Sequence, residues 1–386
     1  MTTTAETTAN SAPGMELLDG SSAIAASAIA AGMSFFAGYP MSPFTHLLES
    51  LSKRLPKAGG VCLNAESEIE GVNMVLGAAA AGARAATGSC GQGIALMQEA
   101  IAEAAQNETP FVVFNMARGH ADYFQCTKGG GWGDYRTITL APKDIHEAVE
   151  HTQLAFHLAD KHRSPVVFLG DPLLATTQVA VRIERLDFGP LPPKDWALDG
   201  STSGTGASRQ VWTWAMGKVT DPGVGMDQHW RNIAGKFDHI ASVEARHEEI
   251  DVDDADVLVV AYGSAAAFVE HVTKRLRREG HKVGVFRPIT LWPFPGEALM
   301  KATEGKRKVL VFEVNSGQML DDVRAWTHDR RSIEFIGGVS VHESGMSFGA
   351  LLDAPVIRER ILAHLRGGSG VTPPIPATHM DTGVVG

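Results

Sequence analysis

Cysteine is scarce in this sequence, because its 386 residues contain only three: Cys62, Cys90 and Cys126. They are scattered, and no C-x-x-C pair occurs. We therefore expect neither a disulfide scaffold nor an iron–sulfur cluster held by this chain alone. An isolated cysteine is typically a small buried hydrophobic residue, which is the role we expect for each of the three.

The sequence also has few positively charged residues relative to acidic ones, and it has no long apolar run. There are 34 Lys and Arg against 44 Asp and Glu, a formal net charge of -10 that argues against a nucleic-acid-binding surface. No apolar run approaches the roughly 18 residues of a membrane span. Residues 1–14 lack the basic flank and apolar stretch of a signal peptide. We expect a cytoplasmic protein that binds neither nucleic acid nor membrane, with 1–14 as a disordered tail.

Strand and helix patterns alternate along residues 15–185 and again along 251–366. In the first stretch, an apolar strand at 35–39 precedes a helix at 44–54, and strands and helices continue to alternate after it. Such alternation predicts βαβ units and a mostly parallel sheet. The length and the restart of the pattern predict two α/β domains.

Residues 186–250 interrupt this pattern, because they are rich in Pro, Gly, Asp, Trp and Ser and show poor periodicity. Trp212, Trp214 and Trp230 would not normally sit in a free linker. We therefore expect an inter-domain segment that packs between the domains. The Gly-, Pro- and Thr-rich residues 367–386 are predicted to form a flexible tail.

A strand-to-helix corner follows the first apolar strand of the repeating pattern, with the sequence "GYPMSPF". Pro40 and Pro43 fix φ locally and restrict Tyr39 and Ser42 to extended conformations. Ser42 is thereby held at the carboxyl end of a strand, which is where open α/β sheets bind ligands.

An E-x-E pair, Glu66 and Glu68, precedes the apolar helix "GVNMVLGAAAAGA". Acidic residues in a first helical turn are ordinary complements of the helix dipole. Because this helix is almost wholly apolar, we also expect it to be buried, and a desolvated carboxylate at its start would suit proton transfer. Further on, "TGSCGQG" at 87–93 is either an anion-binding turn or a tight turn at a sheet edge, and it lacks the G-K-[ST] of a Walker loop.

A long loop is predicted at 116–136, "MARGHADYFQCTKGGGWGDYR". Loops of this length without secondary structure are usually functional or disordered, and the aromatic content argues against disorder. Arg118 at a strand end suits carboxylate recognition, although a surface arginine beside a flexible loop is the alternative. "RPITLWPFP" at 287–295 is more simply interpreted as a rigid packing corner.

Taken together, these motifs resemble one enzyme family. "GYPMSP" resembles the G-Y-P-[IV]-[ST]-P motif of the 2-oxoacid:acceptor (ferredoxin) oxidoreductases, which use thiamine diphosphate. The E-x-E, "ARG", "LAP", "VAYGS", "RPITLWPFP" and "EVNSGQM" follow in the family's order, over roughly residues 17–185 and 250–350. The chain is similar to the alpha subunit in the form without a fused gamma domain. The resemblance implies two doubly wound domains: a pyrimidine-binding domain at 15–185 and a transketolase C-terminal-like domain at 251–366.

The resemblance also implies an activity, namely CoA-dependent oxidative decarboxylation of a 2-oxoacid to an acyl-CoA and CO2. Electrons would pass to ferredoxin or a similar acceptor. The resemblance implies that thiamine diphosphate is shared with a beta subunit, which would hold its diphosphate end. The sequence agrees, because it contains no G-D-G…N stretch of the type that holds Mg²⁺-diphosphate. Mg²⁺ and iron–sulfur clusters are expected on partner chains, among them a gamma subunit and a ferredoxin-like subunit, and no metal site is expected here.

The family's functional residues map onto this sequence one by one. Glu68, nine residues before Gly77, matches the carboxylate that hydrogen-bonds N1′ of the cofactor's aminopyrimidine, with Glu66 as runner-up. Ser42, Arg118, His120 and Tyr123 are the implied substrate-binding residues. The implied cofactor-binding residues are Tyr39, Pro40, Glu68, Gly88, Ser89, Gly91 and Gly93.

The sequence does not decide which 2-oxoacid is the substrate. Many 2-oxoglutarate-type subunits carry "RGGPSTG", whereas the segment here looks more like the branched-chain (2-oxoisovalerate) type, with His120 in place of the expected glycine. An aromatic loop with Tyr123, Phe124 and Trp132 suits a branched or aryl side chain. The alternatives are a 2-oxoglutarate oxidoreductase subunit, a non-oxidative thiamine decarboxylase or carboligase subunit, and a non-catalytic assembly protein that retains the fold.

Overall fold

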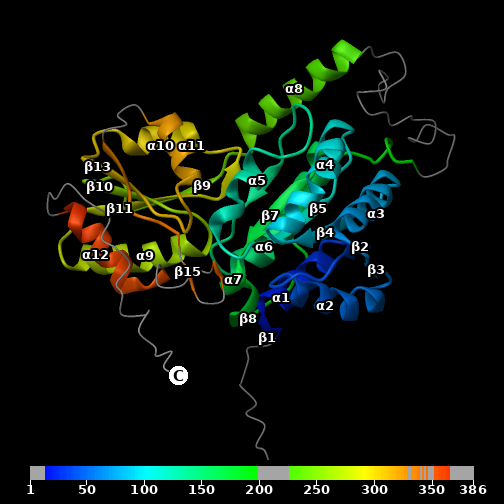
Figure 1. The fold of residues 1–386 in the computed structure, drawn as a ribbon, viewed down its shortest axis with the longest axis horizontal. Coiled ribbons are helices and arrows are strands. Elements are labelled where there is room, and N and C mark those ends of the chain that lie inside the picture. The colour runs from blue at the N-terminus through cyan, green and yellow to red at the C-terminus, as the bar shows by residue number, and fades with distance from the viewer. Residues whose placement is uncertain are drawn as a thin grey trace, which may run out of the picture.

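The structure is a computed structural model, and it describes residues 14–198, 226–327, 332–339, 341–342, 345–346 and 352–365 (Figure 1). The tails predicted at 1–14 and 367–386 lie outside these ranges, apart from Gly14, and so do Trp212 and Trp214. Two α/β units lie side by side in Figure 1, each with helices on both faces of its sheet.

The first sheet has seven strands in the order β12-β6-β7-β5-β4-β2-β3, and its first six strands in chain order run parallel to one another. Those six are β2 (Phe35–Gly38), β3 (Val61–Asn64), β4 (Ala85–Ser89), β5 (Val112–Met116), β6 (Ile138–Leu140) and β7 (Val166–Gly170). Every residue of β4, β5, β6 and β7 is buried. Continuous apolar strands of this kind are typical of a parallel sheet covered on both faces.

Helices from both sides cover this sheet. One group is α1 (Gly20–Ala30), α2 (Thr45–Arg54) and α6 (Ile145–His162), and the other is α3 (Glu68–Ala80) and α4 (Gln92–Gln106) (Figure 1). Asp19 caps the first of these helices, because its side chain accepts from the Ser22 N–H at 2.8 Å. A short antiparallel pair, β1 (Glu16–Asp19) and β8 (Gln178–Val181), also belongs to this unit. The short helix α7 (Pro172–Thr176) directly precedes β8, and η1 (Pro56–Ala58) follows α2.

The second sheet has the order β14-β13-β10-β11-β9, in which only β9 runs antiparallel. Its strands are β9 (His247–Ile250), β10 (Val257–Val260), β11 (Val283–Pro288), β13 (Lys308–Val311) and β14 (Ile333–Phe335). The helices α9 (Gly263–Arg278) and α12 (Ala354–Leu365) pack together on one face, and α10 (Gly296–Thr303) and α11 (Gln318–Trp326) on the other (Figure 1). A small pair, β15 (Val341–His342) and β16 (Gly345–Met346), completes the described strands. No helix within the described ranges is long and apolar enough to cross a membrane.

Two segments that we expected to be irregular contain helices. Within 186–250 the chain forms α8 (Met226–Val243), in which Ile233, Phe237 and Ile240 are buried at helical spacing. Trp230 lies on the same helix and packs against the core, as its presence in the segment suggested. The predicted loop at 116–136 contains η2 (His120–Asp122) and α5 (Tyr123–Thr127), which are too short to leave a periodic signal.

The corner "RPITLWPFP" joins the two units. After β11 the chain crosses over and adds β12 (Thr290–Trp292) to the edge of the first sheet, antiparallel to β6, with Thr290 paired to Leu140. The Ala141 N–H also donates to the Ile289 carbonyl at 3.0 Å. The segment therefore does turn a corner, but its role goes beyond packing, because it makes the second unit part of the first sheet.

Arg287, at the end of β11, is a buried charge at this junction, with 2% of its surface exposed. Its guanidinium binds both oxygens of Glu147 from α6, at 2.7 and 3.0 Å, and Glu248 from β9 at 2.8 Å. Lys143 links Glu248 to Glu270. Burial opposes ionisation of Glu248, but the hydrogen bond from Lys143 and the charge of Arg287 lower its pKa. This ion-pair network spans both units.

We predict that Arg287→Ala destabilises the protein by about 3 kcal/mol, because it leaves two carboxylates facing each other without their buried cation. The value is at the low end for a buried pair, since Glu147 and Glu248 keep partial access to water. Chemical denaturation at neutral pH measures the change, and Arg275→Ala, an exposed arginine on α9, is the matched control.

The stability difference between Arg287→Ala and wild type should also depend on pH. The folded-state pKa of Glu248 lies below its unfolded value, so its contribution to stability is present at neutral pH and is lost as the pH falls through the lowered pKa. The deficit of Arg287→Ala should therefore narrow below about pH 4. An equal deficit at pH 7 and at acid pH would contradict the ion-pair explanation.

Candidate active site at the carboxyl end of the first sheet

The order of the first sheet reverses between β2 and β4, which is where an open α/β sheet forms its ligand crevice. These strands are neighbours, but the chain leaves β2 toward the edge strand β3 and leaves β4 toward β5, on the opposite side. Such a divergence separates the two loops at the carboxyl ends, where open α/β sheets bind ligands. The loops are "GYPMSP" and "GSCGQG", and they meet: the Cys90 thiol donates to the Ser42 carbonyl at 3.3 Å. The structure thus brings together two motifs that are 48 residues apart.

Glu68 is the first residue of α3 and is buried beside this crevice, with 4% exposed. The Ser89 hydroxyl, at the end of β4, donates to Glu68 Oε1 at 3.1 Å. Within the described ranges Ser89 is its only recorded hydrogen-bond partner, which leaves Oε2 available to a ligand. Glu66, the runner-up, is exposed. Burial and partner therefore single out Glu68.

Three glycines allow this placement of Glu68. A Cβ on Gly71 would lie 3.3 Å from the Gly38 Cα, so α3 crosses β2 in close contact. A Cβ on Gly93, in the first turn of α4, would lie 2.0 Å from Ser89 Oγ and 2.4 Å from Glu68 Oε1. A side chain at Gly93 would therefore displace the carboxylate or its partner.

Arg118 follows β5 and reaches the same corner. Its Nε donates to the Ser42 carbonyl at 3.1 Å and its Nη1 to Gln92 Oε1 at 3.0 Å. Ser42 and Arg118, both predicted to bind substrate, are thus neighbours on the exposed rim. The guanidinium fork is partly used by these contacts, and Nη2 is the nitrogen for which the described chain provides no hydrogen bond.

The other residues predicted to bind cofactor occupy different environments. A Cβ on Gly88 would meet Phe44 Cε2 at 2.4 Å and the Phe114 carbonyl at 2.6 Å, so close core packing already requires this glycine. Tyr39 and Pro40 are exposed at the rim. Gly91 has φ 50° and ψ −111°, a conformation that favours glycine, and open space surrounds its Cα. Cofactor contacts of these residues stay predictions.

The structure places His120 and Tyr123 away from the crevice, in the contact between the two units. The His120 ring stacks on Tyr262 at 4.4 Å, and burial lowers the pKa of His120 to about 3. It is therefore neutral at pH 7 and offers no charge to a carboxylate. Tyr123 is fully buried and its hydroxyl donates to Asp322 at 2.7 Å. Both side chains thus make inter-domain contacts, which a family motif read along one domain could not show. Their predicted substrate contacts stay predictions.

The expected contact between the aromatic loop and an acyl side chain also stays a prediction. Phe124 and Trp132 are exposed, at 37% and 48%, and neither lines the inter-domain cleft described next. The three glycines at 129–131 have a packing explanation: the N–H groups of Gly130 and Gly131 donate to the Tyr135 hydroxyl, and a Cβ on Gly131 would lie 2.4 Å from the Gln98 carbonyl.

A cleft of about 360 Å³ lies between the units, next to Arg118. Its first-domain wall comes from the start of α4 and from the 118–125 segment, and its second-domain wall from the "VNSGQ" turn before α11. The lining residues are Gly91, Gln92, Ala95, Arg118, Gly119, Ala121, Asp122, Gln125, Val314, Asn315, Ser316, Gln318 and Val339. Arg118 is the only cation among them. Asp122 accepts from the Gly91 N–H at 2.8 Å, and burial raises its pKa.

Asp122, Asn315 and Gln318 are thus site residues to which the sequence assigned no role. "EVNSGQM" carried part of the family resemblance, which was a signal that the turn before α11 matters, but nothing local to it indicates a cleft.

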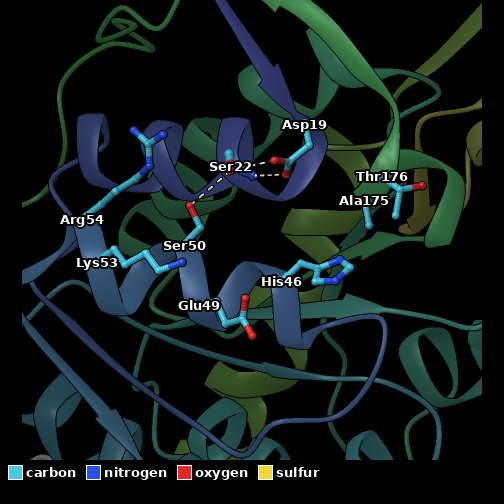
Figure 2. A pocket seen from close by; sticks show the side chains of 9 residues that line it. All are labelled: Asp19, Ser22, His46, Glu49, Ser50, Lys53, Arg54, Ala175 and Thr176. Atoms are coloured by element: carbon cyan, nitrogen blue, oxygen red, sulfur yellow. Dashed lines mark hydrogen bonds between the residues drawn. The ribbon is translucent and has the colours of Figure 1, made fainter. Parts of the chain in front are cut away.

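A second hollow, of about 400 Å³, lies between α1 and α2 (Figure 2). Figure 2 shows Asp19 bonded to Ser22, with Ser50 beside it and the side chains of Lys53 and Arg54 along α2. None of the predicted site residues lines this hollow. The crevice and the cleft are therefore the better candidates for the active site.

Two family models match the chain. The first, "Pyruvate flavodoxin/ferredoxin oxidoreductase, thiamine diP-bdg", covers residues 26–189, and the second, "Pyruvate:ferredoxin oxidoreductase core domain II", covers residues 255–345. Ketoisovalerate oxidoreductase subunit VorB from Methanothermobacter marburgensis is 34% identical, over 80% of this chain and 89% of the relative. The chain belongs to the 2-oxoacid:ferredoxin oxidoreductase family. It is an alpha subunit of the branched-chain or 2-oxoglutarate type, as the resemblance implied.

Other members of this oxidoreductase family give the same result. 2-Oxoglutarate synthase subunit KorA from Methanothermobacter thermautotrophicus is 31% identical, over 83% of this chain and 93% of the relative. A solved 2-oxoglutarate:ferredoxin oxidoreductase from Magnetococcus marinus, with 2-oxoglutarate, coenzyme A and succinyl-CoA bound, matches with a TM-score of 0.79 at 28% identity. That match covers 91% of this chain, which spans 65% of the solved one.

The predicted fold class is confirmed. A split-gene transketolase, 12% identical with a TM-score of 0.53, shares the fold with this oxidoreductase subunit. The relatives are named as subunits, so the protein works within a heteromeric complex.

We predict that Gly93→Ala abolishes most of the complex's activity while the fold survives, because the new methyl group must displace Ser89 or Glu68. Losing a positioned proton-transfer group costs about 10²–10⁴-fold in rate. Steady-state assays and circular dichroism measure the two effects.

Gly77→Ala is the matched control for this variant. Gly77 is also a helical glycine, but a Cβ there meets nothing within 4 Å. Equal losses of activity in Gly93→Ala and Gly77→Ala would contradict the explanation that Gly93 is needed to leave space for Glu68.

Proposed function

We propose that this alpha subunit takes part in the CoA-dependent oxidative decarboxylation of a monocarboxylic 2-oxoacid with an apolar side chain, branched or aryl, to an acyl-CoA and CO2, with electrons passed to ferredoxin or a similar acceptor. The observation that carries the choice of substrate is the charge of the cleft. Its lining holds one cation, Arg118, and one carboxylate, Asp122, among otherwise neutral residues. A dicarboxylate would leave its second charge without a cationic partner.

Glu68 fits the role of the cofactor-activating carboxylate. Its Oε1 is fixed by Ser89, its Oε2 is available, and Gly93 leaves room beside it. Thiamine diphosphate, when bound, would supply the nucleophilic carbon and the electron sink for decarboxylation. Glu68 would hold a proton at Oε2, against N1′ of the aminopyrimidine. A fixed, water-poor carboxylate is suited to share that proton.

Arg118 and Ser42 would orient the 2-oxoacid. Arg118 lines the cleft, and its Nη2 would bind the substrate carboxylate while Nε and Nη1 keep their contacts with Ser42 and Gln92. The Ser42 hydroxyl would donate to the oxo oxygen, since the backbone of Ser42 is held by Cys90 and Arg118. Both roles are positioning roles, which lower the barrier by fixing the geometry of attack.

A beta subunit would complete the site with the diphosphate pocket and Mg²⁺. An exposed apolar surface next to Glu68 supports this: we expected α3 to be buried all round, but Ile69 and Met74 are exposed, as are Leu96 on α4 and Val61 and Leu63 on the edge strand β3. Surfaces of this kind mark protein interfaces. A gamma subunit and a ferredoxin-like chain, with the iron–sulfur clusters, and a cytoplasmic location remain predictions.

2-Oxoglutarate is the second candidate substrate. Several relatives are named for it, and the solved neighbour has it bound. The amide side chains of Gln125 and Gln318 in the cleft could bind a second carboxylate without a cation.

We predict that Glu68→Gln lowers kcat of the co-purified complex by about 10²–10⁴-fold, because an amide cannot share the proton. Glu66→Gln, an exposed carboxylate two residues away, is the control and should behave like wild type. Full activity in Glu68→Gln would favour a non-catalytic role for the chain.

We also predict a substrate ranking. With CoA and a viologen dye, branched-chain or aryl 2-oxoacids should exceed 2-oxoglutarate in kcat/KM by about tenfold or more, the cost of one unpaired charge. Gln125→Lys adds a cation to the cleft and should raise the relative kcat/KM for 2-oxoglutarate, whereas Gln125→Met should not. A wild-type preference for 2-oxoglutarate would contradict the charge argument.

A further inference from the structure

The second domain holds the segment beside Arg118 through side chains at and before α11, one of which is the carboxylate of Asp322. We infer that Asp322, on α11, is a positioning residue for Arg118, acting through the 120–128 segment of the first domain. The inference rests on the proposed role of Arg118 in binding the 2-oxoacid. It concerns residues outside the cleft, because Asp322, Tyr123 and Lys128 do not line it.

Both oxygens of the Asp322 carboxylate are engaged by the first domain. The Tyr123 hydroxyl donates to Oδ2 at 2.7 Å, and Lys128 Nζ lies 2.5 Å from Oδ1. Tyr123 is fully buried, and its ring also packs 5.5 Å from Tyr262. We call Asp322, Tyr123 and Lys128 the latch. Because Tyr123 and Lys128 stand at either end of α5, the latch fixes that whole turn.

The start of α11 holds the backbone of the same segment. Gln318 accepts from the Phe124 N–H and donates to the Ala121 carbonyl, both at 2.9 Å, and Asn315 donates to the His120 carbonyl at 2.9 Å. This end of α11 is itself fixed, because the buried Glu313 carboxylate accepts from the N–H groups of its second and third residues. The latch therefore connects to a rigid support.

Two further hydrogen bonds connect the 120–128 segment to Arg118. Asp122, which directly precedes Tyr123 of the latch, accepts from the Gly91 N–H at 2.8 Å. The next residue, Gln92, accepts from Arg118 Nη1 at 3.0 Å. Glycine can adopt many backbone conformations. The hydrogen bond from the Gly91 N–H to Asp122 therefore favours the one conformation that Gly91 has here. Through these contacts the second domain sets where the guanidinium stands.

A structural role alone would hold the domains together without affecting how the 2-oxoacid binds. A positioning role predicts a specific kinetic result: loosening the latch should raise KM for the 2-oxoacid more than it lowers kcat, since the chain of hydrogen bonds ends on Arg118. Its effect should also depend on Arg118.

The test uses the reconstituted complex with Asp322→Ala and the milder Tyr123→Phe, which keeps the buried ring and removes one hydrogen bond. Asp321→Ala, an exposed aspartate one residue earlier on the same helix, is the matched control. We expect KM to rise about 3- to 30-fold in the latch variants and to stay unchanged in the control. In an Arg118→Lys background, the same latch variants should add little, because the group they position is gone.

A loss of thermal stability with unchanged KM, or an equal KM increase in the Arg118→Lys background, would overturn the inference. Hydrogen exchange of the 90–93 segment, measured on full-length chain, gives a readout independent of catalysis: Tyr123→Phe should speed exchange there, and wild-type rates would overturn the inference. If the wild-type complex oxidises no 2-oxoacid, the proposed function fails, and this exchange result still decides whether the latch holds Gly91.

Discussion

The buried guanidinium of Arg287 is the contact on which the arrangement of the two domains depends. A cation with 2% exposure is stable only when its hydrogen bonds are satisfied, and its partners come from different places: Glu147 from α6 of the first domain and Glu248 from β9 of the second. Because all of these groups must meet in one geometry, the ion pairs select a single orientation of the domains. The crossing strand β12 follows directly and extends the first sheet. The cleft beside Arg118 exists only in that orientation, since its two walls come from different domains.

Within the first domain, the position of Glu68 depends on the close packing of α3 against β2 and against the start of α4. Burying a carboxylate is unfavourable unless a donor meets it, and Ser89 is that donor. The donor can reach Glu68 only because Gly71 lets α3 cross Gly38 and Gly93 leaves space at the start of α4. The absence of side chains at Gly71 and Gly93 is therefore what allows the buried carboxylate and its donor to meet.

The parts of the site that could be predicted from the sequence are those tied to strand ends. Ser42, Ser89 and Arg118 each follow a parallel strand, and the carboxyl ends of parallel strands meet at one edge, so their convergence followed from the βαβ pattern alone. Tyr123 and His120 could not be placed this way. Their partners lie far along the chain, with Asp322 199 residues from Tyr123, and an aromatic-rich loop has the same composition whether it lines a pocket or packs against a domain. The helix α8 was missed because Trp, His, Asp and Gly obscured a short apolar stripe.

The two domains contribute differently to the proposed site. The groups proposed to act on the substrate lie on the first domain, and the second domain positions one of them, Arg118. Arg118 stands on an exposed rim, where a long side chain has many conformations and solvent competes for its hydrogen bonds. The first domain fixes two of its nitrogens through Ser42 and Gln92. Gln92 in turn follows Gly91, a residue with wide backbone freedom, so the arrangement needs an outside support. That support is the segment held by Asn315, Gln318 and Asp322, which makes the second domain a structural determinant of how a 2-oxoacid would be oriented.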